Sequence, residues 1–179
     1  MKPLIDADIL RYEIGFSAQF NDEEGNEVLL DFDRCAEILD EKIRIICEEI
    51  DATDEPTLYL TSDRHTARMT STELIPNFRE KVATIKPYKG NRKKNKPFHF
   101  VNLTAYILSK YNYKVANGFE ADDLMAIDQE ENTSHFLSRS RTPTVICSRD
   151  KDLRMVPGYH YSWECGKQAS IGPVFVDPL

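Results

Sequence analysis

The segment PLIDAD, residues 3–8, joins a short apolar run to two acids. A short apolar run bounded by polar residues is typical of a buried strand. Asp6 stands where this strand would end, and a carboxylate beside a buried strand is costly unless a cation meets it. The segment therefore predicts a buried strand at 3–6 with an acid at its carboxyl end.

Acids follow other apolar runs in the same way. They occur in GFEADD, residues 118–123, in VICSRDKD, residues 145–152, and just after TLYLT, residues 57–61. Any one of them alone is more simply explained as a helix cap or a solvated charge. Carboxylates from distant segments that meet would suit the hard cations Mg²⁺ or Mn²⁺. The candidate metal ligands are Asp6, Asp63, Glu120, Asp122, Asp123, Asp150 and Asp152.

Strand-like and helix-like segments alternate along the chain. Strands are predicted at 3–6, 57–61, 114–116, 144–148 and 159–163, and helices at 9–18, 98–111 and 121–129. A further helix, N-capped by Asp33, carries an apolar stripe of Leu39, Ile43, Ile46 and Ile50. Residues 22–26 are expected as a turn and 128–143 as a polar surface insertion. This alternation predicts an α/β fold with a mostly parallel central sheet and helices on both faces.

Such a sheet would bring the acids together, because functional groups of open α/β sheets collect beyond the carboxyl ends of the strands. Asp150 and Asp152 would share a side if the chain stayed extended that far. Glu120 and Asp123, three residues apart at the start of a helix, would share one helix face. The joint pattern favours a metal site.

Composition excludes several other classes of protein. The chain of 179 residues is 41% hydrophobic and 30% charged, as expected of one globular domain. It has no apolar run long enough for a membrane span and no signal-peptide pattern, which favours a cytoplasmic protein. The cysteines, Cys35, Cys47, Cys147 and Cys165, are too scattered for a zinc site or a disulfide framework.

One segment opposes the acidic balance of the rest. Residues 79–96 carry eight basic side chains and one acid, so their net charge is +7 and the remainder must hold −14 of the total of −7. A charge run is most often a solvated loop, but a field this segregated can also hold a polyanion. A basic strip beside an acidic site is what metal-dependent phosphodiester cleavage needs.

Taken together, LIDAD, TSDR, FREKVATIKPYKGNRKKNKP, GFEADD and SRDKDL resemble the 5′-nuclease superfamily, most of all its phage-encoded exonucleases. The resemblance runs in order from residue 4 to residue 163 and implies a PIN-like catalytic domain. It implies two bound Mg²⁺ or Mn²⁺ ions, held by the seven acids named above. Asp8 matches the family's acids less consistently. It also implies hydrolysis of 5′ ends or flaps of DNA, or of RNA–DNA hybrids, in the host cytoplasm if a phage encodes the protein.

The resemblance also assigns roles to the basic segment. Lys89 and Arg92 are the expected catalytic cations, which would stabilise the charge of the transition state. Tyr88 would stack on an unpaired base. The expected nucleic-acid-binding residues, in an arch at 76–97, are Arg79, Tyr88, Lys89, Arg92, Lys93 and Lys94.

The chain departs from the family pattern after SRDKDL. Family members continue there into a helix–hairpin module that grips duplex DNA, whereas here residues 166–179 are expected as a tail after a catalytic domain at 1–165. We therefore expect a separately encoded C-terminal subunit, a truncated product or a minimal enzyme. Two other classes stay open: a PIN-type endoribonuclease, which usually lacks a long basic arch, and a non-catalytic nucleic-acid-binding subunit.

Overall fold

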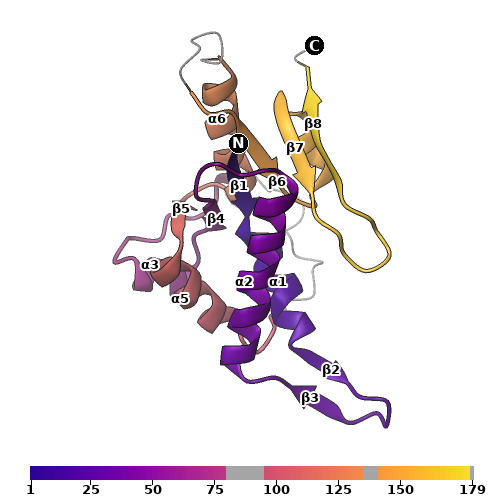
Figure 1. Ribbon diagram of the computed structural model, residues 1–179. Coiled ribbons are helices and arrows are strands. Elements are labelled where there is room, and N and C mark those ends of the chain that lie inside the picture. Colours follow the sequence, from indigo (N-terminus) through magenta and orange to yellow (C-terminus); the bar gives the residue numbers. More distant parts are fainter. Residues whose placement is uncertain (80–94, 135–140, 178–179) are drawn as a thin grey trace.

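A six-stranded sheet forms the centre of the protein, in the strand order β5-β4-β1-β6-β7-β8 (Figure 1). The computed structural model describes residues 1–79, 95–134 and 141–177. Neighbouring strands are parallel from β5 to β7, and β8 alone runs antiparallel to its neighbour. The predicted mostly parallel α/β sheet is confirmed. The strands are β1 (Lys2–Asp6), β4 (Thr57–Thr61), β5 (Asn112–Ala116), β6 (Thr144–Cys147), β7 (Gly158–Ser162) and β8 (Ile171–Val176).

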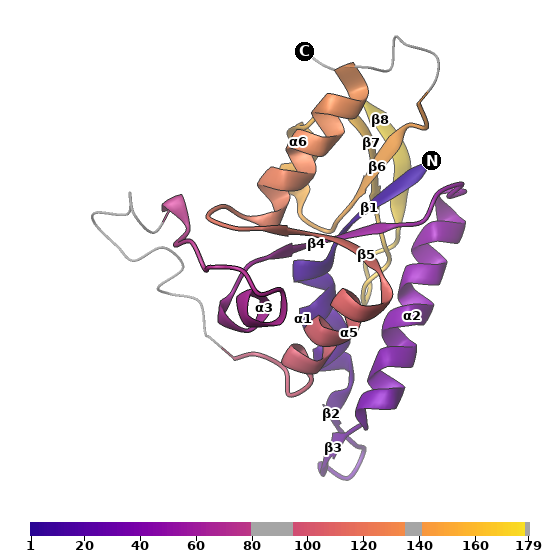
Figure 2. The same ribbon diagram turned by 90° about the vertical axis from the view of Figure 1, so that its left-hand side faces the viewer.

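Helices cover both faces of this sheet, as predicted, and Figure 2 shows the sheet between them. Ile5 and Leu58 face a core shared with α1 (Ala7–Ser17), α2 (Phe32–Glu49) and α5 (Phe100–Lys110). Their neighbours Leu4 and Tyr59 face the opposite core, beneath α6 (Ala121–Ser134). Successive strand residues point to opposite faces, so each apolar strand serves two cores. Two short helices, α3 (Arg64–Met69) and η1 (Lys151–Met155), follow β4 and β6.

The start of α2 and the end of α6 differ from the sequence prediction. The N-cap of α2 is Asp31, whose carboxylate accepts the Arg34 N–H at 2.9 Å, while Asp33 lies in the first turn. Helix α6 continues to Ser134, beyond the predicted end at 129 and into the expected insertion. It continues because the Gln129 Oε1 accepts from the Thr144 Oγ at 2.6 Å and the Asn132 Oδ1 accepts from the Thr144 N–H at 3.2 Å. Polar residues thus tie this helix end to the sheet.

A two-stranded hairpin, β2 (Gln19–Asn21) and β3 (Glu27–Leu29), projects from the body beyond α1 and α2 (Figure 1). The turn predicted at 22–26 joins its strands. The Asp22 Oδ1 accepts the Glu24 and Asn26 N–H groups at 3.0 and 2.8 Å. Gly25 has φ 84°, a left-handed conformation that glycine adopts without strain.

The segment expected as a C-terminal tail contains a strand of the central sheet. Strand β8 pairs antiparallel with β7, with Phe175 opposite Tyr159 and Val174 opposite His160. The rings of Tyr159 and Phe175 lie 5.0 Å apart in an edge-on arrangement. The sequence IGPVFV is rich in β-branched and aromatic residues, which suit such pairing. The sheet therefore extends beyond residue 165.

Two expectations drawn from composition can be compared with the structure. All four cysteines are free thiols, as expected. None of the helices within the described ranges is both long and apolar enough to cross a membrane.

Candidate metal centre

Four adjacent strands bring acids to one edge of the sheet. Strands β5, β4, β1 and β6 are neighbours and parallel, so their carboxyl ends lie at the same edge. Each of them ends at or shortly before one of the predicted acids. We call this set the acidic rim: Asp6, Asp8, Asp63, Glu120, Asp122, Asp123 and Asp150.

Asp6 is the most deeply buried aspartate of the rim, with 4% of its surface exposed. It ends β1 and caps α1, since its Oδ1 accepts the Ile9 N–H at 3.3 Å. Its Oδ2 accepts from the Ser148 hydroxyl at 2.7 Å. Burial, and then the charges of Asp8 and Asp122, raise the pKa of Asp6 to about 7. A bound cation would stabilise the ionised form of Asp6 and so offset this cost.

Ser148 connects Asp6 to the segment after β6. Its Oγ also accepts the Asp150 N–H at 3.0 Å, and the Asp150 Oδ1 accepts the Asp152 N–H at 2.9 Å. Asp150 is therefore the N-cap of η1, and the chain turns there instead of staying extended. The condition under which Asp150 and Asp152 were expected to share a side, a chain that stays extended, is therefore not met, and Asp152 is exposed.

Asp8 lies closer to the centre of the rim than the sequence indicated. Its Oδ1 accepts the Thr61 N–H at 2.9 Å and pairs with the Arg11 Nη2 at 2.6 Å. The Thr61 hydroxyl donates to the Asp8 Oδ2 and accepts the Ala121 N–H at 2.9 Å. This chain of bonds links α1, β4 and α6. Sequence reasoning missed Arg11, Thr61 and Ser148; the position of Thr61 at the end of TLYLT and the Asp8–Arg11 spacing were the available signals.

On the β5–α6 side, the acids meet a guanidinium. Arg79 donates from Nη1 to the Glu120 Oε2 and from Nη2 to the Asp123 Oδ1, the latter at 3.2 Å. Glu120 and Asp123 thus share one face, as predicted, and the Glu120 N–H donates to the Asp123 Oδ2 at 3.1 Å. Burial, followed by the charges of Asp123 and Glu120, raises the pKa of Asp122. The charge of Arg79 acts in the opposite direction and lowers the pKa of Asp122.

Asp63 has a different environment at the end of β4. It caps α3 by accepting the Thr66 N–H at 2.7 Å, and the Lys96 Nζ lies 3.8 Å from its Oδ2. Burial acts to raise the pKa of Asp63, but the bonds from Thr66 and the charges of Arg11 and Lys96 outweigh burial, and the pKa is lowered. Asp63 is therefore held as a carboxylate.

The donor chemistry of the rim suits a hard divalent cation, because it consists of carboxylates, and burial followed by neighbouring acids raises the pKa of Asp6 and of Asp122. A closed ligand set is not preformed. Within residues 1–79, 95–134 and 141–177, no group of three or more His, Cys, Asp or Glu side chains is arranged to hold a metal ion. Arg79, Lys96 and backbone N–H groups engage these carboxylates instead. The assignment of the seven acids as ligands stays a prediction.

Most of the predicted basic arch lies outside the described residues. This applies to the expected catalytic cations Lys89 and Arg92, and to Tyr88, Lys93 and Lys94. Of the predicted nucleic-acid-binding residues, Arg79 is described, and it lies at the acidic rim.

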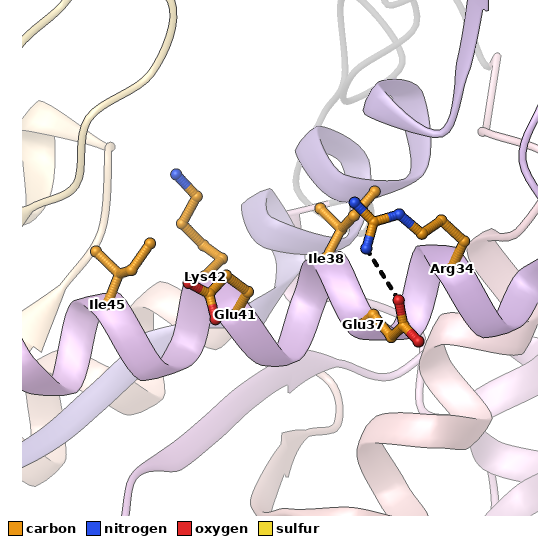
Figure 3. A pocket seen from close by; sticks show the side chains of 6 residues that line it. All are labelled: Arg34, Glu37, Ile38, Glu41, Lys42 and Ile45. Atoms are coloured by element: carbon orange, nitrogen blue, oxygen red, sulfur yellow. Dashed lines mark hydrogen bonds and ion pairs between the residues drawn. The ribbon is translucent and has the colours of Figure 1, made fainter.

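A shallow hollow elsewhere, along the outer side of α2, contains none of the predicted site residues. Figure 3 shows the ion pair between Arg34 and Glu37 in it, at 2.9 Å. Its lining residues are Arg34, Glu37, Ile38, Glu41, Lys42 and Ile45.

Comparison with known proteins relates the chain to solved structures only. No model of a protein family matches this sequence, and no curated protein does. A structure of the T5 5′-exonuclease with bound zinc aligns with 91% of this chain and 55% of its own, at a TM-score of 0.50 and 10% identity. The T5 D15 protein co-crystallised with metal ions aligns over 90% of this chain and 54% of its own length, at a TM-score of 0.49 and 13% identity.

The catalytic core of Rad2 in complex with a DNA substrate also aligns, with 94% of this chain and 46% of its own, at a TM-score of 0.44 and 15% identity. The chain thus spans about half the length of the solved proteins that it matches. At identities this low, a likeness shows the fold alone. Most of this chain therefore has the fold seen in the T5 5′-exonuclease.

Proposed function

We propose that this protein is a divalent-metal-dependent nuclease that hydrolyses phosphodiester bonds at 5′ ends or flaps of DNA. The observation that carries the proposal is the acidic rim: four adjacent parallel strands deliver carboxylates to one edge of the sheet. There, burial and neighbouring acids raise the pKa of Asp6 to about 7. The fold shared with the T5 5′-exonuclease supports the same reading.

The rim residues would divide the work of holding cations and substrate. Asp6, Asp63, Glu120, Asp122, Asp123 and Asp150 would hold Mg²⁺ or Mn²⁺, as two ions, with the exposed Asp152 at the margin. Bound divalent ions lower the pKa of a water ligand and offset phosphate charge. Ser148 and Thr61 would keep Asp6 and Asp8 oriented, since each donates to one of these carboxylates. Arg79 would hold the Glu120 side of the rim together before substrate binds.

The basic segment would supply the contacts to nucleic acid. Lys89 and Arg92 would stabilise the charge that develops on the phosphate, a contribution of a few kcal/mol, about 2.7–4 kcal/mol for one such donor. Tyr88 would stack on an unpaired base. If the segment neutralises phosphates, the logarithm of the affinity for duplex should fall with the logarithm of salt concentration by about 0.9 per phosphate. A flat salt response would show that the segment does not bind phosphates.

A cleavage assay tests the proposal directly. The substrates are 5′-labelled single-stranded DNA, duplex DNA, a 5′ flap and an RNA–DNA hybrid, with Mg²⁺, with Mn²⁺ and with a chelator. We expect metal-dependent release of short products from the labelled 5′ end, fastest on the flap or on free 5′ ends. Internal cuts in RNA alone would favour the PIN-type endoribonuclease. Binding without cleavage of any substrate would favour the non-catalytic subunit.

The same assay tests whether a second polypeptide is required. We propose that a separately encoded C-terminal subunit assists duplex binding, as the resemblance to the 5′-nuclease superfamily implies. The substrates are therefore tested with and without any protein encoded beside this one. A tighter complex and faster duplex cleavage with that protein would support the subunit. Equal rates with and without it would exclude that requirement.

A further inference from the structure

Arg149 lies between Ser148 and Asp150, and its guanidinium connects three parts of the fold. Its Nε pairs with the Glu13 Oε1 of α1 at 3.1 Å. Its Nη1 donates to the Trp163 carbonyl, just beyond β7, at 3.0 Å. Its Nη2 donates to the Gln168 Oε1, in the connection between β7 and β8. All three guanidinium nitrogens are thus engaged, which fixes the plane of the side chain.

Glu13 completes this network on the side of α1. Its second oxygen, Oε2, accepts from the Trp163 indole N–H at 2.8 Å. The side chains of Arg149 and Glu13 are only 18% and 22% exposed, and Trp163 is 1% exposed. A pair that is largely shielded from water is screened less than a surface pair. Its geometry is therefore more firmly set than that of the exposed ion pairs on α2.

The network is connected to the acidic rim because Arg149 lies between Ser148 and Asp150 in the chain. Ser148 donates to Asp6 and accepts from the Asp150 N–H, and the Ser148 N–H donates to the Tyr161 carbonyl at 3.1 Å. Arg149 holds the next peptide unit to α1, the helix that begins beside Asp6 and contains Asp8. The segment 148–150 is thus fixed to β1, α1 and β7 at once.

We propose that Glu13 and Arg149 are positioning residues that set where the Asp150 carboxylate stands relative to Asp6, and so determine the affinity of this side of the rim for a divalent cation. This inference rests on the proposed function. Neither residue touches the reacting atoms; both act through the backbone of the Asp150 segment. Partners that bond directly to a metal ligand typically change metal affinity 10–100-fold when they are removed, and a pair that acts through the backbone is expected at the lower end of that range.

The sole tryptophan of the chain gives a direct spectroscopic report on this network. The indole N–H of Trp163 is bonded to Glu13, so its emission should respond when the Glu13–Arg149 pair moves. If a cation at Asp150 is coupled to the pair, Mg²⁺ binding should change Trp163 emission in the wild-type protein. The binding curve then needs neither nucleic acid nor cleavage.

The experiment compares Arg149→Met, Glu13→Gln and Arg149→Lys with the wild-type protein. Mg²⁺ affinity is measured by calorimetry and by Trp163 emission on the whole chain, with thermal unfolding as a check on folding. We expect about 10-fold weaker Mg²⁺ binding in Arg149→Met and Glu13→Gln. Arg149→Lys should restore little, because an ammonium cannot reproduce the planar fork. The control is Arg44→Met, whose guanidinium also engages three carboxylate oxygens, on exposed α2.

Each outcome decides the inference. Weaker Mg²⁺ binding in the Arg149 and Glu13 variants, with the Arg44 variant unchanged, would support the positioning role. If Arg149→Met and Glu13→Gln bind Mg²⁺ with wild-type affinity, the network only stabilises the fold, even if the Tm is lowered. The positioning role would then be refuted, and the proposed function would be unaffected. A wild-type protein that binds no Mg²⁺ in calorimetry would overturn both. Should Arg149→Met fail to fold, the milder Glu13→Gln carries the comparison.

Discussion

On the β1–β6 side of the acidic rim, the Ser148 hydroxyl and backbone groups hold Asp6 and Asp150, whereas on the β5–α6 side the Arg79 guanidinium pairs with Glu120 and Asp123. Asp6 and Asp150 share the Ser148 hydroxyl, which is buried and lies between them. Glu120 and Asp123 instead share Arg79, whose side chain is 33% exposed. Fixed neutral donors define a geometry without cancelling charge. A guanidinium cancels charge, and it must be displaced before a metal ion can bind the same carboxylates.

The difference suggests a division of labour within one site. On the β1–β6 side, burial, followed by the charge of Asp8, raises the pKa of Asp6 to about 7, and a bound cation would favour its charged form. The β5–α6 side is already compensated in part by Arg79. Under the proposed function, Arg79 would have to release Glu120 and Asp123 before a cation could bind there.

The largest expected effect comes from removing one ligand charge on each side. Asp150→Asn and Asp122→Asn should each reduce Mg²⁺-dependent cleavage on the order of 100-fold or more, beyond the typical loss for an outer partner. Asn keeps the shape of the residue and can still cap η1 at position 150. Initial rates on the flap substrate measure the effect, with the exposed Asp33→Asn as control. Loss on one side only would mean that the other side holds no cation.

Ser148→Ala should produce the next largest effect, on stability. The variant removes the donor to the buried Asp6 and the acceptor of the Asp150 N–H. Leaving buried polar groups without these bonds costs about 1–3 kcal/mol. Urea unfolding should show this loss, and saturating Mg²⁺ should restore only part of it, because the Asp150 N–H still lacks its acceptor. Full recovery with Mg²⁺ would mean that the hydroxyl matters only through the charge of Asp6.

Arg79→Met should give a smaller loss that behaves oppositely toward Mg²⁺. The guanidinium is partly exposed, so its removal should cost about 1 kcal/mol. Because Glu120 and Asp123 no longer have to release a guanidinium, Mg²⁺ should raise the Tm of the variant more than it raises that of the wild-type protein. Thermal unfolding with and without Mg²⁺ measures both quantities, with Arg34→Met on α2 as control. An equal Mg²⁺ response in both proteins would show that Arg79 does not compete with the cation.

The smallest expected effect is a pH dependence that originates on the β6–β7 side. Burial lowers the pKa of His160, whose Nε2 is 2.6 Å from the Val156 carbonyl; the Arg154 charge acts in the same direction. The pKa of a histidine in the unfolded chain is about 6.5. The stability that neutral His160 contributes is therefore complete above that pH and is lost as the pH falls through the pKa of the folded state. Urea midpoints of the wild-type protein and of His160→Gln, at several pH values, measure it. A parallel pH dependence in the two proteins would assign the effect elsewhere.

Much of the fold could be predicted because its signals are local. Apolar runs such as TLYLT and TVIC identified their strands, and the stripe of Leu39, Ile43 and Ile46 identified α2. Two errors came from signals that only pairing could supply. Strand β8 lies in the segment that the sequence predicts as a tail, because only its pairing with β7 makes it a strand of the sheet. Helix α6 extends beyond its predicted end because Thr144 of β6 bonds to its polar residues.

In the candidate site, too, some features followed from local sequence signals and others did not. That acids would stand at the carboxyl edge followed from strand alternation, and that Glu120 and Asp123 would share a face followed from helix geometry. The turn at Asp150 did not follow, because an Asp can either continue a strand or cap a helix. Nor did the network of Glu13, Arg149 and Trp163, whose members are distant in sequence and carry no common motif.

The sequence by itself determined which residue types end each strand, and thereby the chemistry available at the edge of the sheet: carboxylates from four segments and a basic segment apart from them. Only the tertiary structure decided how that chemistry is distributed. It placed Ser148 between two acids and Arg79 between two others, and it drew Arg149 toward Glu13. The physical reason is that hydrophobic periodicity acts within one segment, whereas the partner of a buried charge is chosen by whichever distant segment the packing brings beside it.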